Sequence, residues 1–235
     1  MALLEKMMAH RDDTQVDNLS RFFKTQPGQY GEGDLFLGIK VPVTREITKR
    51  LWRETGFDEL EKCVVSPYHE VRLAALLTLV QIYQHGKKGS EEQKACVDFY
   101  LSHTRFINNW DLVDLSCYEI LGNWLLDKER TLLYDLARDG KTIWERRIGI
   151  VSTMAFLRKG ELDDTYEIAD ILLNDNHDLI QKATGWLLRE AGKRDEERLK
   201  TYLLPRYKKM PRTMLRYAIE KFPEEERKKY LRGEK

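Results

Sequence analysis

A tryptophan and an acid stand one helical turn apart in the segment INNWDLVDLS, residues 107–116. Trp110 and Asp114 are four positions apart, so on a helix their side chains project from the same face. The face of an indole attracts cations, and a carboxylate can stabilise developing positive charge or orient a water molecule. The pair therefore predicts a site for a reaction in which positive charge lies on or beside the reacting group.

Structural roles are the alternative to this chemistry. A helical Trp belongs to the core more often than to a site, and Arg146 and Arg147 in the following segment are alternative ion-pair partners for Asp114. Asp111 lies where a helix is expected to start, which suits a cap or a partner of the helix dipole. Two other tryptophans are assigned to the core, Trp52 and Trp124.

Helices are the elements that must hold these residues, because strand patterns are almost absent. Gly and Pro number only 14 and 6, and the one clear loop is TQPGQYGEGD, residues 25–34. Elsewhere apolar residues recur with the period of a helix. Comparable helical segments lie at residues 69–80, 108–121, 143–157, 179–192 and 210–222.

Each of these segments follows another amphipathic stretch, such as residues 163–173. Two helices in a unit of about 40 residues is the pattern of HEAT and armadillo repeats, which stack into a solenoid with a concave face. We therefore predict an all-α superhelix of HEAT-like repeats that forms a single domain over residues 1–235. Gly185 lies inside one predicted helix, where Gly costs about 1 kcal/mol relative to Ala, so we expect it to permit close approach of another backbone.

Charged residues recur on the second helix of each unit, which is expected to line the concave face. One unit has Asp114 at this position, and the other four have Arg72, Arg147, Lys182 and Arg212. Residues 181–221 contain 12 Lys and Arg against 5 Asp and Glu. Such a segment is as typical of a solvated helix face as of a surface that contacts phosphates.

If the recurring cations line a groove, the reaction at the tryptophan and the acid is expected to take place on a polyanion such as DNA. A DNA base alkylated at a ring nitrogen is cationic and leaves as a neutral molecule, so its glycosidic bond is already weakened. Its removal needs little general acid, but it needs stabilisation of an oxocarbenium-like sugar and an aligned water molecule. One Asp beside aromatic walls would meet those needs.

Composition excludes several other classes of protein. Hydrophobic residues make up 42% of the chain and charged residues 34%, which excludes a disordered chain. The three Cys are widely spaced and the five His lack ligand spacing, so we expect buried, reduced thiols, no metal site and no cofactor. No stretch approaches the roughly 20 apolar residues of a membrane span, and the N-terminus does not resemble a signal peptide. We therefore expect a cytoplasmic protein.

Four motifs occur in a fixed order and are specific as a set. They are DLFLGIKVPVTRE at residues 34–46, NWDLVD at 109–114, IWERR at 143–147 and QKATGWLLREAGK at 181–193. Through these motifs the sequence resembles the AlkD-like DNA alkylation repair proteins, a family of HEAT-like DNA glycosylases. The resemblance covers most of the chain.

The resemblance implies hydrolysis of N3- and N7-alkylated purines from duplex DNA, without flipping the base into a pocket. By motif, Asp114 is the catalytic carboxylate, and Trp110 and Trp186 are aromatic walls against the lesion nucleotide. Arg147 of IWERR holds the DNA backbone near the lesion. Phe22, in SRFFK, departs from the family pattern because some members have Tyr there. It keeps an aromatic face and lacks the hydroxyl.

We therefore predict a monomeric DNA glycosylase of base excision repair whose partner is double-stranded DNA. The further residues expected to contact DNA are Phe22, Arg45, Lys49, Lys182, Arg189, Arg212 and Arg216. One alternative is a non-catalytic HEAT-repeat protein that binds bent or branched DNA, and another is a protein-interaction scaffold. A basic groove is expected for both the glycosylase and the non-catalytic DNA-binding protein, whereas the acid and the indoles favour the glycosylase.

Overall fold

The computed structural model describes residues 2–235, and regular secondary structure in this range is helical apart from one isolated bridge between Leu35 and Tyr68. The predicted all-α helical-repeat fold is therefore confirmed. The α-helices are α1 (Ala2–Ala9), α2 (Asp13–Phe22), α3 (Val41–Leu51), α4 (Phe57–Val64), α5 (His69–His85), α6 (Glu91–Ser102), α7 (Trp110–Asp114), α8 (Thr131–Asp139), α9 (Ile143–Val151), α10 (Met154–Leu157), α11 (Asp163–Ile171), α12 (Asp178–Gly192), α13 (Glu196–Leu203), α14 (Arg212–Ala218) and α15 (Glu224–Arg232). Short 3-10 turns lie at Thr104–Phe106 and Leu125–Asp127, and a π-helical turn lies at Tyr118–Gly122.

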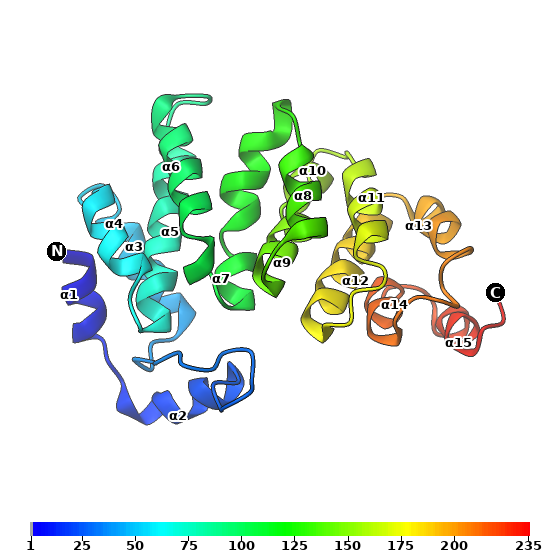
Figure 1. Ribbon diagram of the computed structural model, residues 1–235, viewed down its shortest axis with the longest axis horizontal. Coiled ribbons are helices and arrows are strands. Elements are labelled where there is room, and N and C mark those ends of the chain that lie inside the picture. The colour runs from blue at the N-terminus through cyan, green and yellow to red at the C-terminus, as the bar shows by residue number, and fades with distance from the viewer. Residues whose placement is uncertain (1) are drawn as a thin grey trace. The chain divides into compact units, whose positions relative to one another are not determined.

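Two compact units make up the chain, Met1–Ile120 and Leu121–Lys235. Helices α1 to α7 belong to the first unit and α8 to α15 to the second, and Figure 1 labels each of them. The prediction of a single domain over residues 1–235 stays a prediction.

Helix α5 is the core of the first unit. It contacts α1, α3, α4, α6 and α7, and buried side chains such as Leu73, Leu76 and Leu79 lie all round it. A helix that is buried on every side has no solvent-facing side and therefore needs no polar face. This explains why an apolar run as dense as VRLAALLTLV lies at the centre of the unit.

The FLGI motif forms a loop that is held by a buried acid of α5. The carboxylate of Glu70 accepts hydrogen bonds from the backbone N–H groups of Leu37 (2.9 Å), Gly38 (2.9 Å) and Ile39 (3.1 Å). Gly38 has a φ of 83°, and a Cβ atom there would clash with the carbonyl oxygen of Asp12. The position therefore requires glycine, and the loop brings the segment before α2 against the core.

Two of the predicted long helices are interrupted along their length. Residues 108–121 divide into α7 and a π-helical turn, and residues 143–157 divide into α9 and α10. Near each break a buried hydroxyl bonds back to the preceding turn: Ser116 Oγ donates to the Leu112 carbonyl at 2.5 Å, and Thr153 Oγ1 to the Ile150 carbonyl at 2.7 Å. Such back-bonding competes with the helical ladder and bends helices.

The second unit is built from helices packed in pairs, with contacts between α8 and α9, α11 and α12, and α12 and α14. A Cβ atom at Gly185 of α12 would clash with the carbonyl oxygen of Met214 and approach Tyr217 Cβ, both in α14. The prediction that Gly185 permits close approach of another backbone is confirmed.

Several smaller expectations can be compared with residues 2–235. The thiols of Cys63, Cys96 and Cys117 are buried and belong to no disulfide, as predicted. Assignment of Trp52 and Trp124 to the core was wrong. Both are partly exposed and are covered by polar side chains instead of the core. Trp52 stacks on His85 and lies beneath Arg53, and Lys128 lies over the ring of Trp124. Across the described chain, no helix combines the length and apolar character needed to span a bilayer.

Candidate functional site

Trp110 and Asp114 are the first and last residues of α7. The helix begins at Trp110 because the Asn109 side chain caps it, accepting a hydrogen bond from the Trp110 N–H at 2.9 Å. The cap is therefore Asn109 and not Asp111. Leu112 and Val113 are fully buried, whereas Trp110 and Asp114 are partly exposed. The indole and the carboxylate therefore lie one turn apart on a helix whose apolar side chains are covered.

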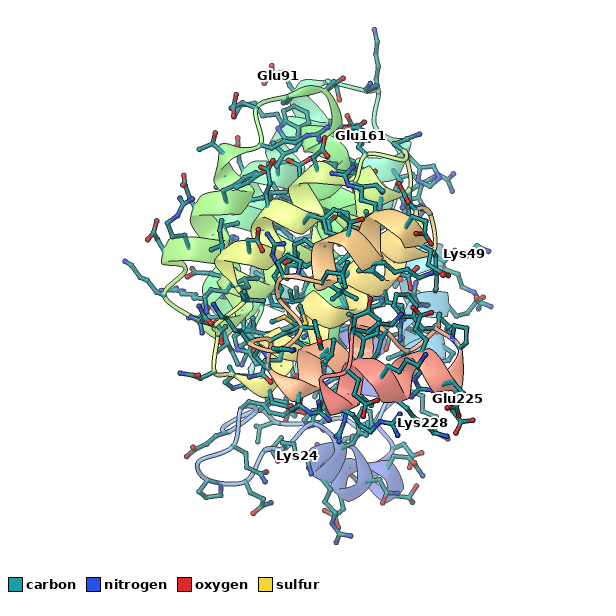
Figure 2. All side chains as sticks on the ribbon, turned by 90° about the vertical axis from the view of Figure 1, so that its right-hand side faces the viewer. Lys24, Lys49, Glu91, Glu161, Glu225 and Lys228 are labelled. Atoms are coloured by element: carbon teal, nitrogen blue, oxygen red, sulfur yellow. The ribbon has the colours of Figure 1, made fainter. Side chains whose placement is uncertain are left out.

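Two phenylalanines at the end of α2 pack against the indole of Trp110. Phe22 is 60% exposed and meets the indole edge-on, with ring centroids 5.9 Å apart. Phe23 is buried and stacks on the same indole at 5.5 Å. Lys24 follows with a φ of 58° and lies at the surface (Figure 2). The structure thus brings the predicted aromatic residue Phe22 beside Trp110.

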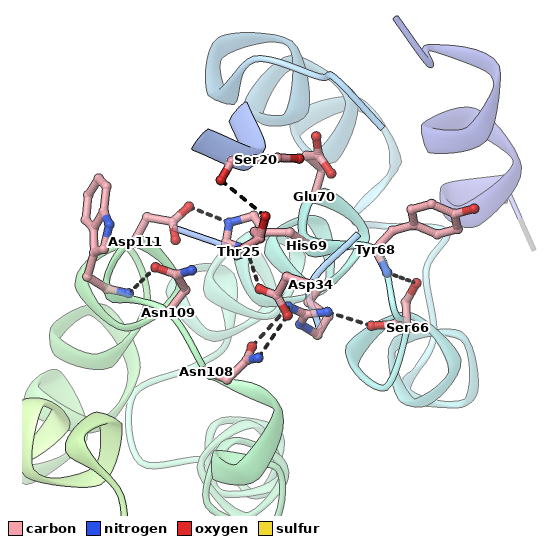
Figure 3. A network of polar contacts seen from close by, with 12 residues as sticks. Ser20, Thr25, Asp34, Ser66, Tyr68, His69, Glu70, Asn108, Asn109 and Asp111 are labelled. Atoms are coloured by element: carbon pink, nitrogen blue, oxygen red, sulfur yellow. Dashed lines mark hydrogen bonds and ion pairs between the residues drawn. The ribbon is translucent and has the colours of Figure 1, made fainter. Parts of the chain in front are cut away.

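A buried polar network lies behind this aromatic surface (Figure 3). His69, at the start of α5, is 1% exposed and places both ring nitrogens near carboxylates. Its Nε2 lies 2.8 Å from Asp111 Oδ2, and its Nδ1 lies 3.3 Å from Asp34 Oδ2. Asp34 also pairs with the Arg72 guanidinium at 2.7 Å and accepts a hydrogen bond from Asn108 at 3.0 Å. The network connects the N-terminal loop, α5 and the start of α7.

The electrostatics of this network favour a protonated histidine. Burial alone lowers the pKa of His69, but the charge and hydrogen bond of Asp111, together with the hydrogen bond of Asp34, raise it to about 9. Burial raises the pKa of Asp34. The hydrogen bond from His69 and the charge of Arg72 outweigh this effect, so the pKa of Asp34 lies below its ordinary value. At neutral pH His69 is therefore a second cation of the network beside Arg72.

Arg72 corrects one expectation. We predicted that it lines a concave surface as one of the recurring cations. The side chain is buried and pairs with Asp34, and its Nη1 donates to the Ser66 carbonyl at 2.8 Å. A cation this deep requires such partners, so the helical periodicity placed it on the wrong face.

Arg45 and Lys49 are exposed one turn apart on α3, and Lys49 lies at the surface in Figure 2. Both border a hollow of about 330 Å³, with Leu77 of α5 and Leu115 and Tyr118 after α7 among its walls. The two predicted DNA contacts of α3 thus share a hollow with the chain that leaves the end of α7.

The second unit holds Trp186 and Arg147. Trp186 is partly exposed on α12, one turn after Lys182. Arg147 of α9 is buried, and its Nη1 donates to the Leu179 carbonyl at 2.5 Å. Arg147 therefore braces the start of α12 within its own unit, and its part in holding DNA stays a prediction.

The remaining predicted cations differ in how strongly acids hold them. Lys182 pairs with Asp178 at 2.7 Å, and Arg189 pairs with Glu220. Arg212 is exposed and donates to a backbone carbonyl near the C-terminus, and Arg216 is exposed. Arg212 and Arg216 are the most accessible of the four.

The support behind the indole was not predicted from the sequence. His69 was recognised only as a histidine without ligand spacing, and Phe23 and Phe36 were not singled out. The ring of His69 packs against Phe23 at 4.6 Å and Phe36 at 4.9 Å. Aromatic and acidic residues around the FLGI motif and beside His69 could have indicated this support. They lie far in the sequence from every predicted catalytic residue.

Fold and site together define an all-α helical-repeat protein with an exposed aromatic and acidic surface on its first unit. A family model for DNA alkylation repair enzymes matches residues 3–222. The chain belongs to this family, which gives it a role in the repair of alkylated DNA.

One solved structure with a similar fold is described as "Predicted DNA alkylation repair enzyme from Enterococcus faecalis". It matches with a TM-score of 0.70 at 18% identity, over 91% of this chain and 97% of the other. At this identity the match shows a shared fold. Among curated proteins, none has a significant match to this sequence.

Proposed function

We propose that the protein is a DNA glycosylase that removes cationic N3- and N7-alkylated purines from duplex DNA without drawing the base into a pocket. The observation that carries this proposal is the partly exposed pair of Trp110 and Asp114 on one turn of α7, with Phe22 exposed beside the indole. A surface of this kind suits a lesion that stays in the duplex, in contrast to enzymes that flip the base.

The reaction begins with heterolysis of the C1′–N bond. Both bonding electrons leave with the base, which was cationic and departs neutral, and positive charge develops on the sugar. Asp114 stabilises that charge and orients a water molecule. The water oxygen bonds to C1′ and its proton passes to the carboxylate and then to solvent. The products are the free base and an abasic site.

The other predicted residues have binding roles in this proposal. Trp186 is a second aromatic wall, and Arg147 holds the DNA backbone near the lesion. Phosphate contacts supply affinity that is independent of sequence and falls with salt. They are assigned to Arg45, Lys49, Lys182, Arg189, Arg212 and Arg216. The protein acts as a monomer on double-stranded DNA.

The test is release of free base from duplex DNA containing N7-methylguanine, with wild type beside Asp114→Asn. We expect the substitution to lower the single-turnover rate by about 100-fold or more and to leave duplex affinity unchanged or higher. Asp98→Asn is the matched control, because Asp98 is an exposed carboxylate of the same unit that pairs with Lys94 at 2.5 Å. The control should release base at the wild-type rate.

Two outcomes would contradict the proposal. If Asp114→Asn loses duplex affinity and excision in equal measure, Asp114 is a structural acid. If neither protein releases base while both bind duplex tightly, the protein is a non-catalytic DNA binder instead.

A further inference from the structure

Two independent connections join His69 to Trp110. The first runs through side chains, because the ring of Phe23 packs on His69 at 4.6 Å and on the indole at 5.5 Å. The second runs through the backbone, because Asp111, which His69 binds at 2.8 Å, is the next residue after Trp110. Movement of the imidazole would therefore displace both the stacking partner of the indole and the first turn of α7.

The position of the Asp111 side chain depends on His69. Asp111 is 3% exposed, and among residues 2–235 its Oδ1 has no hydrogen-bond partner. His69 is itself held in place by Asp34 and by the rings of Phe23 and Phe36. The histidine is thus the fixed member of the pair, and the acid and α7 follow it.

We propose that His69 and Asp111 are positioning residues, which set the orientation of the Trp110 indole, and with it Asp114, for the DNA lesion. The part that concerns catalysis rests on the glycosylase function proposed above. Neither residue touches the lesion in this account. They act through the first turn of α7 and through Phe23.

Energetics favour such a role over simple stabilisation. A buried ion pair is often no more stable than well-packed apolar residues of the same volume. An ion pair fixes the orientation of its side chains better than apolar packing does, because each ring nitrogen must meet one carboxylate oxygen. Around a partly exposed indole, apolar contacts alone constrain the rotation and tilt of the ring less tightly.

The indole N–H signal of Trp110 in a two-dimensional nitrogen–proton spectrum tests the positioning directly, once Trp110→Phe identifies it among the five tryptophans. We expect His69→Gln to shift and broaden this signal and to leave that of Trp186, in the second unit, unmoved. Asp111→Asn keeps an acceptor for His69 and should give a smaller shift of the same signal. It also serves if His69→Gln does not fold.

A second readout separates positioning from general loss of stability. Single-turnover base release by His69→Gln should fall by about tenfold or more, because small displacements of reacting groups have large effects on rate, while duplex affinity changes little. His103→Gln is the matched control. His103 is also buried in the first unit and pairs with an acid, Glu61, at 2.9 Å, but it packs against Phe99. This control should lose stability and leave both the Trp110 signal and the rate unchanged.

The outcomes are distinct. An unmoved Trp110 signal in His69→Gln, or a rate equal to that of the His103→Gln control, would overturn the positioning role. If wild type releases no base, the glycosylase proposal fails by itself. The Trp110 signal then still decides whether His69 orients the indole.

Discussion

Stability of the protein should fall as pH rises from 6.5 to 9, because of His69. The pKa of this side chain is raised from 6.5 to about 9 by the carboxylates of Asp111 and Asp34, against burial and the charge of Arg72. Below 6.5 both the folded and unfolded states carry the proton. Between 6.5 and 9 the unfolded state loses it while the folded state retains it. The contribution is therefore fully present below pH 6.5 and is lost as pH rises through 9.

The magnitude follows from the shift. Each pKa unit corresponds to about 1.4 kcal/mol, so a rise from 6.5 to about 9 corresponds to about 3 kcal/mol in the free energy of unfolding. The side chain is almost fully buried, so solvent screens it little. Burial also raises the pKa of Cys63 and Cys96 to about 12. These thiols reduce stability in the same direction at pH values above their ordinary pKa of 9, which leaves the window from 6.5 to 8.5 mainly to His69.

The assay is urea unfolding followed by circular dichroism at half-unit steps of pH. Wild type should lose stability across the window, and His69→Gln, which has no proton to lose, should show a nearly flat profile. Equal slopes in wild type and His69→Gln, or wild-type stability that rises with pH, would refute the assignment of a charged, buried histidine.

Three further predictions concern packing and binding. Gly185→Ala should destabilise the protein by about 1–3 kcal/mol in urea unfolding, although Ala is the better helix former, because the added methyl group clashes with α14; Gly56→Ala, where a Cβ meets no atom within 4 Å, should cost less, about 0.5–1 kcal/mol, because Gly56 caps α4 and Ala is a poorer cap. Glu70→Gln should cost about 1–3 kcal/mol in the same assay, because it replaces one acceptor of the three FLGI backbone N–H groups with a donor. Replacing Arg45 and Lys49 together with Ala should reduce the slope of log affinity against log salt by about 2 in duplex-binding titrations, since each phosphate contact contributes about 0.9; an unchanged slope would place DNA elsewhere.

Local periodicity was enough to predict the helical class and several elements. The segment 163–173 was expected to be helical and is α11, Asp163–Ile171, and the next segment is α12, Asp178–Gly192. These helices depend on contacts within a few residues, which a 3.6-residue pattern reports directly. Gly185 was predictable for the same reason, since a glycine inside a strong helical pattern requires a close neighbour.

Which side of a helix is buried was harder to predict than where the helix lies in the sequence. Arg72 and Arg147 occupy equivalent positions in the repeat pattern and were expected to line a surface, but both are buried. In α5 the pattern carries little information about direction, because the helix is covered on every side. Helix breaks were also missed, because a buried Ser or Thr that bonds back to its own helix looks in sequence like any other polar residue.

The contrast between the two acids of NWDLVD shows why the candidate site could be only half predicted. Asp114 was recognised because its neighbour Trp110 lies one turn away, so a local rule relates them. Asp111 is held by His69, which is 42 positions away in the sequence, and no periodic pattern spans such a distance. An indole and an acid on one helical turn can be found from spacing, but the groups that fix their orientation lie on other helices. In this helical repeat, local spacing therefore predicts which side chains share one turn of a helix, whereas the helices packed behind that turn decide how those side chains are oriented.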